Sequence, residues 1–150
     1  MRVVIQRVKF ASVEVEGKIV SSIKKGLLVL VGIEDSDDDS DIGWIAKKIV
    51  NLRIFDDENA TPNLSLNEVN GEVLLVSQFT LHSSTKKGNR PSYLKASKGH
   101  IALPIFEELC DAVQTECQTK IGKGIFGAHM DVALLNDGPV TILMDSKNKE

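Results

Sequence analysis

Polar side chains follow directly on one of the most apolar stretches of the chain. Val73–Val76 is continuously apolar, as a strand buried on both faces would be, and Ser77, Gln78, Phe79 and Thr80 come next. Hydroxyl and amide groups at the end of a rigid, buried strand are well placed to bind a substrate. Composition alone favours a simpler interpretation, in which the strand emerges into solvent.

A nucleophilic role for Ser77 or Thr80 requires a base that removes the hydroxyl proton. The chain has three histidines, His82, His100 and His129, and no GxSxG segment. His82 lies two residues after Thr80, so a Thr80–His82 dyad is conceivable if the strand continues. Because no short ligand spacing such as HxxxH occurs, neither a metal site nor another cofactor is expected.

A second polar segment, Asn136–Thr141 (NDGPVT), separates two apolar runs near the C-terminus. Asn-Asp-Gly between two strands is favourable hairpin chemistry, so a hairpin turn is the local prediction. Pro139 lacks an N–H group and restricts Gly138. Since only about 5–6% of X-Pro bonds in folded proteins are cis, local physics predicts a trans bond here.

Charge is distributed unevenly along the chain, whose formal net charge is −3. Residues 34–41 hold six acids, whereas no acid occurs between Glu72 and Glu107. That second stretch contains five basic residues, namely Lys86, Lys87, Arg90, Lys95 and Lys98. One concentrated basic stretch in a mildly acidic protein suggests a local anionic partner. A solvated loop whose lysines promote solubility is the alternative.

The pattern of apolar residues predicts one α+β domain spanning residues 1–150. Two main helices should pack against a strongly curved, largely antiparallel, barrel-like sheet. One helix is expected from about Asp38 to Asn51, and another with Pro104 in its first turn. Strands are expected over 3–8, 12–17, 18–23, 26–33, 72–81, 128–136 and 140–145, with a long loop over 82–100.

The chain gives little sign of export or membrane insertion. No apolar run approaches the roughly 20 residues needed to cross a bilayer. The first ten residues are interrupted by Arg2, Arg7 and Lys9, which makes a poor signal peptide and a good strand. Cys110 and Cys117 lie in a helical pattern and form no metal motif. A cytosolic location is therefore expected, with no membrane partner.

Ser77–Leu81 (SQFTL) and Asn136–Thr141 resemble the two signature segments of D-aminoacyl-tRNA deacylases. Further segments of the same family pattern occur in order, and the resemblance covers essentially the whole chain. They are IQRV at 5–8, ASVEVEG at 11–17, GLLVLVGIE at 26–34, RIF at 53–55, GNRPSY at 88–93 and IFGAHM-DV at 125–132. His82 departs from the pattern, which usually has a small residue there.

This resemblance implies a homodimer with two active sites at the subunit interface. Gly138-Pro139 would be cis and would reach into the partner's pocket, where two backbone carbonyls grip the substrate's amino group and exclude an L side chain. Arg7 would brace the Gly-Pro loop, and Phe126 and Met130 would line the pocket.

The implied reaction is hydrolysis of the ester bond of D-aminoacyl-tRNA, and of glycyl-tRNA. Ser77–Thr80 would hold the ester carbonyl, with backbone N–H groups near Phe79 and Thr80 as oxyanion donors. This is favoured over a Thr80 acyl-enzyme because no dedicated base is evident. Lys86, Lys87 and Arg90 would contact phosphates of the acceptor end, and no DNA partner is expected. Two alternatives remain: a related deacylase with a trans Gly-Pro bond and altered chirality, and a non-catalytic tRNA-binding module.

Overall fold

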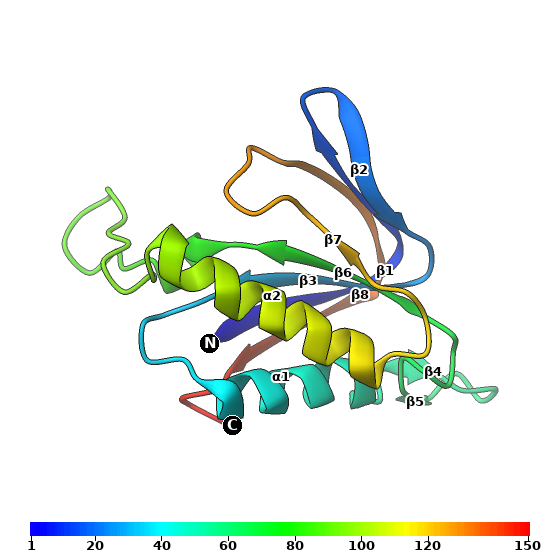
Figure 1. Ribbon diagram of the computed structural model, residues 1–150. Helices are drawn as coiled ribbons and strands as arrows, with labels where there is room; N and C mark the ends of the chain where they lie inside the picture. Colours follow the sequence, from blue (N-terminus) through cyan, green and yellow to red (C-terminus); the bar gives the residue numbers. More distant parts are fainter.

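The computed structural model describes all 150 residues as one domain in which two helices lie on one face of a curved sheet (Figure 1). The elements in chain order are β1 (Arg2–Val15), β2 (Lys18–Ile23), β3 (Gly26–Gly32), α1 (Asp39–Asn51), β4 (Phe55–Asp56), β5 (Pro62–Leu64), β6 (Glu72–Ser77), the 3₁₀ helix η1 (Phe79–His82), α2 (Gly99–Glu116), β7 (Gly122–Lys123) and β8 (Asp131–Asp145). No helix combines the length and the apolar character needed to cross a bilayer.

The main sheet is built around β1, the long N-terminal strand. Along one edge β1 pairs with β8, and along the other it pairs first with β3 and then with β2, always antiparallel. The parallel pairs β3–β6 and β6–β7 extend the sheet, while β4 and β5 form a separate small ribbon. The sequence-based prediction of a curved, largely antiparallel α+β fold is thus confirmed.

Both faces of the central strands are buried, because the sheet packs on the helices on one side and curves over a smaller core on the other. Leu27, Val29 and Val31 of β3 belong to the core shared with α1 and α2. Leu28, from the same strand, packs into the smaller core together with Val76 of β6. This alternation follows the two-residue period of a strand and explains why these segments are apolar without interruption.

Helix α1 begins where the acidic run predicted a helix. Asp38 is its N-cap: the Asp38 side chain accepts from the backbone of Ser40 and Asp41, and the Asp41 side chain accepts from the backbone of Asp38. This reciprocal arrangement is a capping box, and the acids of the first turn also favour the positive end of the helix dipole. Helix α1 ends at Asn51, as predicted.

The prediction that Pro104 lies in the first turn of α2 is wrong, because α2 begins at Gly99. Pro104 therefore lies inside the helix and leaves one carbonyl of the preceding turn without its usual N–H donor. The buried face compensates, since Ala102, Phe106 and Leu109 all pack into the main core. Apolar packing thus extends the helix beyond the start that the proline indicated.

The hairpin predicted at Asn136–Thr141 is also wrong. Residues 131–145 form one strand, β8, that stays paired with β1 on both sides of this segment. Gln6 pairs with Thr141 and Val8 with Asn136, so that four residues of β8 bulge out opposite Arg7 alone. Likewise, the two strands predicted within residues 3–17 form the single strand β1. Turn-forming residues serve a bulge as well as a hairpin, and only the long-range pairing distinguishes the two.

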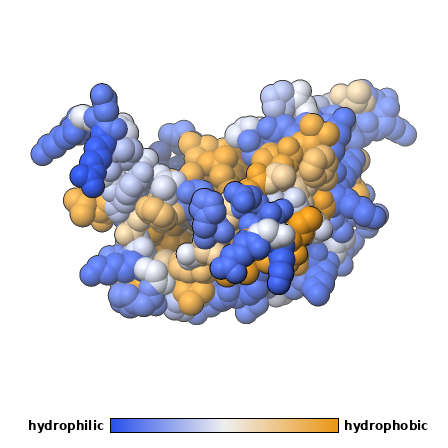
Figure 2. All heavy atoms as spheres, turned by 90° about the horizontal axis from the view of Figure 1, so that it is seen from above, coloured by the Kyte–Doolittle hydropathy of each residue, from blue (hydrophilic) through white to orange (hydrophobic).

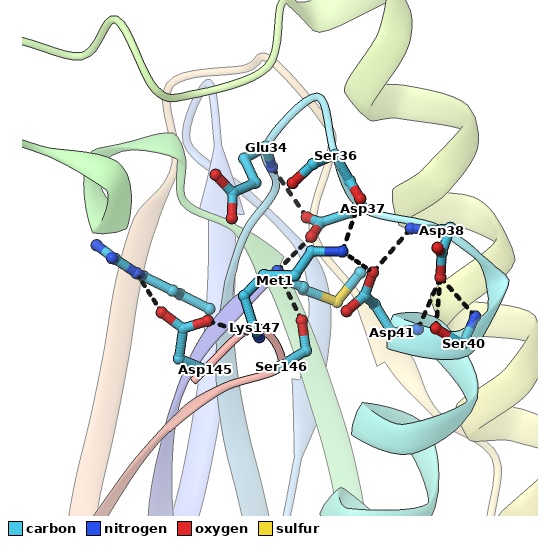
Figure 3. Close-up of polar contacts among 11 residues, drawn as sticks. Met1, Glu34, Ser36, Asp37, Asp38, Ser40, Asp41, Asp145, Ser146 and Lys147 are labelled. Atoms are coloured by element: carbon cyan, nitrogen blue, oxygen red, sulfur yellow. Dashed lines mark hydrogen bonds and ion pairs between the residues drawn. The ribbon is translucent and has the colours of Figure 1, made fainter. Parts of the chain in front are cut away.

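The end of β8 is joined to the start of β1 by buried polar contacts (Figure 3). The Met1 amino group donates to Asp37 and to Ser146 Oγ, 2.8 Å away, and the side chains of both Met1 and Asp37 are fully buried. Lys147 donates to Asp41 from outside this cluster. These contacts connect β1, β8 and the segment that leads into α1.

Candidate active site

A pocket of about 410 Å³ opens where the parallel strands β3 and β6 end at the same edge of the sheet. Crevices at the carboxyl ends of parallel strands are common ligand sites. The start of α2 and the segment leading into β8 supply the opposite wall. The lining residues are Val31, Ile33, Val76, Ser77, Gln78, Phe79, Ser97, Gly99, Ala102, Phe126, Gly127, Ala128, His129, Met130 and Val132.

The polar segment after β6 turns sharply instead of continuing as the predicted strand. The strand ends at Ser77, and η1 begins at Phe79. Gln78 donates its backbone N–H to the carbonyl of Val31 on β3, at 2.6 Å, which fixes the turn to the sheet. Gly32 allows η1 to approach closely, because a Cβ at Gly32 would lie 2.9 Å from Cβ of Leu81.

Two backbone donors are left free at this turn. The N–H groups of Phe79 and Thr80 stand at the first turn of η1, where no preceding carbonyl of the helix can accept from them. Neither donates to another group of the protein. The Gln78 side chain donates to Thr80 Oγ1. Of these residues Gln78 and Phe79 line the pocket, and Thr80 follows them without lining it.

No base is positioned to activate Thr80. His82 does not share a strand face with Thr80, because η1 turns its side chain into the core, where it is 1% exposed and packs near Gly32. No hydrogen bond joins His82 to Thr80, and the dyad considered from the sequence is absent. His129 lines the pocket, but its side chain is 94% exposed and lies 3.6 Å from Asp131.

The opposite wall brings Phe126 and Met130 to the pocket. The ring of Phe126 packs on Phe106 of α2, with ring centroids 5.8 Å apart, which anchors the wall to the main core. Ser97 and Gly99 also line the pocket, although no sequence pattern predicted it. Ser97 is held there by a backbone hydrogen bond to Ile33 and by its hydroxyl, which donates to Asp35.

Gly138 and Pro139 lie outside the pocket of their own chain, in the bulge of β8. The bond between them is cis, in line with the family resemblance and against the local prediction of a trans bond. Both residues are exposed. Gly138 has a φ of +128° and approaches Arg7 so closely that a Cβ would meet Nη2 at 3.1 Å. Any other residue would be strained at this position.

Arg7 is only 6% exposed and connects the bulge to the segment around β4. Its Nε donates to the carbonyl of Asp137 at 3.0 Å, and its Nη1 donates to the carbonyl of Ile54. The carboxylates of Asp56 and Asp137 lie 3.5 and 3.6 Å from the guanidinium. A buried charge with these partners holds the backbone before Gly138 in one position.

The basic stretch forms an exposed loop between η1 and α2 that projects from the body of the molecule (Figure 1). Two backbone hydrogen bonds between Ser84 and Ser92, of 2.8 and 2.9 Å, close its base. Lys86, Lys87 and Arg90 lie between these serines, exposed and without ion-pair partners. Figure 2 shows a face on which apolar surface gathers around a central hollow, with polar side chains at both sides.

Comparisons with known proteins identify the family of the chain. Residues 4–145 match the family model for D-Tyr-tRNA(Tyr) deacylase. D-aminoacyl-tRNA deacylases from Flavobacterium psychrophilum and Bacteroides thetaiotaomicron are 60% and 61% identical to the chain, over the full length of both proteins.

Two solved structures share the fold. One, described as a c-Myc DNA unwinding element binding protein, has a TM-score of 0.92 and 37% identity, covering 97% of this chain and 98% of that one. Another, a probable eukaryotic D-amino acid tRNA deacylase, has a TM-score of 0.82 at 17% identity, covering 95% and 97%, and supports the fold alone. The sequence and family matches together place the chain in the D-Tyr-tRNA(Tyr) deacylase family, a family of hydrolases.

Proposed function

We propose that the protein hydrolyses the ester bond of D-aminoacyl-tRNA and releases the free D-amino acid and tRNA. The observation that carries this proposal is the pair of free N–H groups at Phe79 and Thr80 beside a pocket sized for a small ligand. Two neighbouring backbone donors can stabilise the negative oxygen of a tetrahedral intermediate. The relatives that match over their full length carry the name of this activity.

The reaction requires no protein nucleophile. An aminoacyl ester is already activated, and the neighbouring ribose hydroxyl can position the attacking water. Thr80, whose hydroxyl accepts a hydrogen bond from Gln78, orients the substrate, while the backbone N–H groups hold the carbonyl oxygen. Phe126 and Met130 then contact the terminal adenosine and the aminoacyl group from the opposite wall.

Selection for D substrates depends on a second copy of the chain. In this account, Gly138 and Pro139 of one subunit enter the pocket of the other, where their carbonyls hold the amino group and leave no space for an L side chain. Glycine has no side chain to exclude, so glycyl-tRNA is also cleaved. Support comes from the exposure of the bulge, from its place outside the pocket of its own chain, and from its bracing by Arg7.

A homodimer also fits the surface around the bulge. Phe10 and Leu135, which are cross-strand partners in β1 and β8, are 47% and 48% exposed, and Leu143 of β8 is 70% exposed. Large exposed apolar side chains on β1 and β8 favour burial against another molecule. The self-complementary contact of a two-fold dimer would bury them and complete two sites at once.

Phosphates of the acceptor end bind the basic loop. Lys86, Lys87 and Arg90 are accessible and have no acidic neighbours in sequence, so their charges remain available to an anion. Contacts to phosphate carry no sequence information, in keeping with an enzyme that serves many tRNAs. This substrate places the activity in the cytoplasm.

Mixed dimers test the cross-subunit site. Gly99→Trp should fill the pocket, since a Cβ at Gly99 meets only the Phe126 ring, at 3.8 Å. Gly138→Val should disrupt the bulge against Arg7. Each variant alone should be inactive, whereas exchanging their subunits should restore roughly a quarter of the wild-type activity, because half the dimers then contain one intact site. An inactive mixture of properly folded dimers would refute the shared site.

An ester-hydrolysis assay distinguishes the proposed enzyme from the competing function, a non-catalytic tRNA-binding module. Such a module would bind D-aminoacyl-tRNA without shortening the lifetime of its ester. Ester hydrolysis is followed with labelled D-tyrosyl-tRNA, with the Gly99→Trp protein as control for spontaneous hydrolysis. If the ester were lost at the same rate with the wild-type protein as with Gly99→Trp, the proposed activity would be excluded.

A further inference from the structure

Two exposed aromatic rings meet at the rim of the pocket. Phe79 is 55% exposed and Tyr93 is 39% exposed, although aromatic side chains gain much from burial. Their ring centroids are 5.1 Å apart and their planes cross at 76°. This edge-to-face pairing is favourable, and it leaves a large part of both rings accessible.

The pair stands between the pocket and the basic loop. Phe79 lines the pocket itself. Tyr93 follows Ser92, whose backbone bonds to Ser84 close the loop that carries Lys86, Lys87 and Arg90. A ligand that extends from the pocket toward these basic side chains therefore passes the two rings.

The chemistry of the rim matches single-stranded nucleic acid. Proteins bind unpaired strands by stacking bases on aromatic side chains and by neutralising phosphates with basic ones. Both groups are present here, and no acid between Glu72 and Glu107 opposes the phosphates. A pocket of about 410 Å³ has room for one aminoacylated nucleoside, so the nucleotides before it must lie outside, over the rim.

We propose that Phe79 and Tyr93 form a stacking platform for the unpaired nucleotide that precedes the terminal adenosine of the acceptor strand. This inference rests on the proposed function and adds a binding subsite to it. The subsite recognises the π-face of a base, so it accepts different nucleotides. In this subsite Tyr93 contacts the base directly, whereas a tyrosine that only anchored the loop would not.

The kinetic test compares two substrates, D-aminoacyl-tRNA and D-aminoacyl-adenosine, of which the second lacks the preceding nucleotide. Tyr93→Leu should lower the ratio of kcat/KM for the tRNA to kcat/KM for the adenosine ester about tenfold, through KM, which corresponds to about 1.4 kcal/mol of lost stacking. Tyr93→Phe keeps an aromatic face and should keep the ratio.

Leu94 provides a matched control, because it is the next residue, is apolar and is 96% exposed, yet has no ring. Leu94→Ala should leave the ratio unchanged. If Tyr93→Leu lowers kcat/KM equally for both substrates, Tyr93 only supports the pocket. If it changes neither value, Tyr93 makes no contact with the substrate. Either result leaves the ratio unchanged and overturns the platform. A wild-type protein that cleaves neither substrate would instead refute the proposed function.

Binding gives a readout that does not depend on hydrolysis. An acceptor-stem hairpin with 2-aminopurine immediately before the terminal adenosine reports stacking as a loss of fluorescence. The wild-type protein and Tyr93→Phe should quench this fluorescence on binding, and Tyr93→Leu should not. Binding of the hairpin to the wild-type protein without quenching, or failure to bind, would overturn the platform.

Discussion

The guanidinium of Arg7 donates a hydrogen bond from Nε to the backbone carbonyl of Asp137, 3.0 Å away. This contact links the buried middle of β1 to the first residue of the bulge that contains Gly138 and Pro139. The other side of the guanidinium is held by the carbonyl of Ile54 and by Asp56. The position of the bulge is thus set by a side chain that lies outside the pocket.

Replacing Arg7 by lysine should weaken selection between D- and L-aminoacyl-tRNA. Lysine keeps the charge but cannot donate in two directions from a planar group. A lost charged hydrogen bond costs roughly 1.5–3 kcal/mol, so the ratio of D to L hydrolysis rates should fall at least about tenfold. Arg2→Lys, on the same strand and paired with Asp145, is the matched control. Unchanged selectivity in folded Arg7→Lys protein would refute the bracing role.

Removal of the Thr80 hydroxyl should slow hydrolysis without stopping it. If Thr80 only orients the substrate, Thr80→Ala loses one neutral hydrogen bond, about 0.5–1.5 kcal/mol, and kcat should fall no more than roughly tenfold. Single-turnover rates with saturating enzyme separate this effect from binding. Abolished hydrolysis with intact tRNA binding would instead identify Thr80 as a nucleophile.

Binding of tRNA should weaken steeply as salt is raised, and the basic loop should account for part of this dependence. Each phosphate contact contributes roughly 0.7–0.9 to the slope of log K against log salt concentration. The double change of Lys86 and Lys87 to glutamate should therefore reduce the slope by roughly 1.4–1.8. Lys18→Glu, an exposed lysine on the β1–β2 hairpin, should leave the slope nearly unchanged. A salt-insensitive affinity would contradict the phosphate contacts.

Asp41 should stabilise the fold at neutral pH and lose this effect in acid. Burial alone would raise the pKa of Asp41, but hydrogen bonds from Lys147, Ser146 and the Asp38 backbone lower it to about 2. Because the pKa is lower in the folded state than its ordinary value of 3.8, the stabilisation is complete above about pH 4 and lost as pH falls through 2.

Urea unfolding at several pH values tests this prediction. Asp41→Asn should be less stable than the wild type by about 2 kcal/mol at pH 7, and the difference should shrink toward pH 2. Asp39→Asn, at an exposed position in the same first turn of α1, is the control for general charge effects. A stability difference between wild type and Asp41→Asn that stays constant from pH 7 to 2 would contradict the assigned role of the carboxylate.

Local sequence patterns predicted the elements better than their connections. The spacing of Ile42, Ile45 and Ile49 and the acids before them gave α1 correctly, because capping and amphipathicity act over a few residues. The hairpin expected at Asn136–Thr141 failed because the pairing of β8 with β1 joins residues more than 100 positions apart. Nothing in the local sequence reports that pairing.

The pocket was predictable only in part for the same reason. Ser77, Gln78 and Phe79 follow a buried strand, and that position alone suggested a site. Grouping them with Phe126 and Met130 required the family resemblance, since some 50 residues separate the two walls. Ser97 and Gly99 carry no chemical signature, and they reach the pocket through the start of α2 and one backbone hydrogen bond to Ile33.

Selection by chirality is tested by comparing hydrolysis of D-tyrosyl-, L-tyrosyl- and glycyl-tRNA by the wild-type protein under one set of conditions. We expect rapid cleavage of D-tyrosyl-tRNA, measurable cleavage of glycyl-tRNA, and no cleavage of L-tyrosyl-tRNA above the spontaneous rate. Equal rates for the D and L esters would contradict it, because the clamp of Gly138 and Pro139 would then exclude nothing.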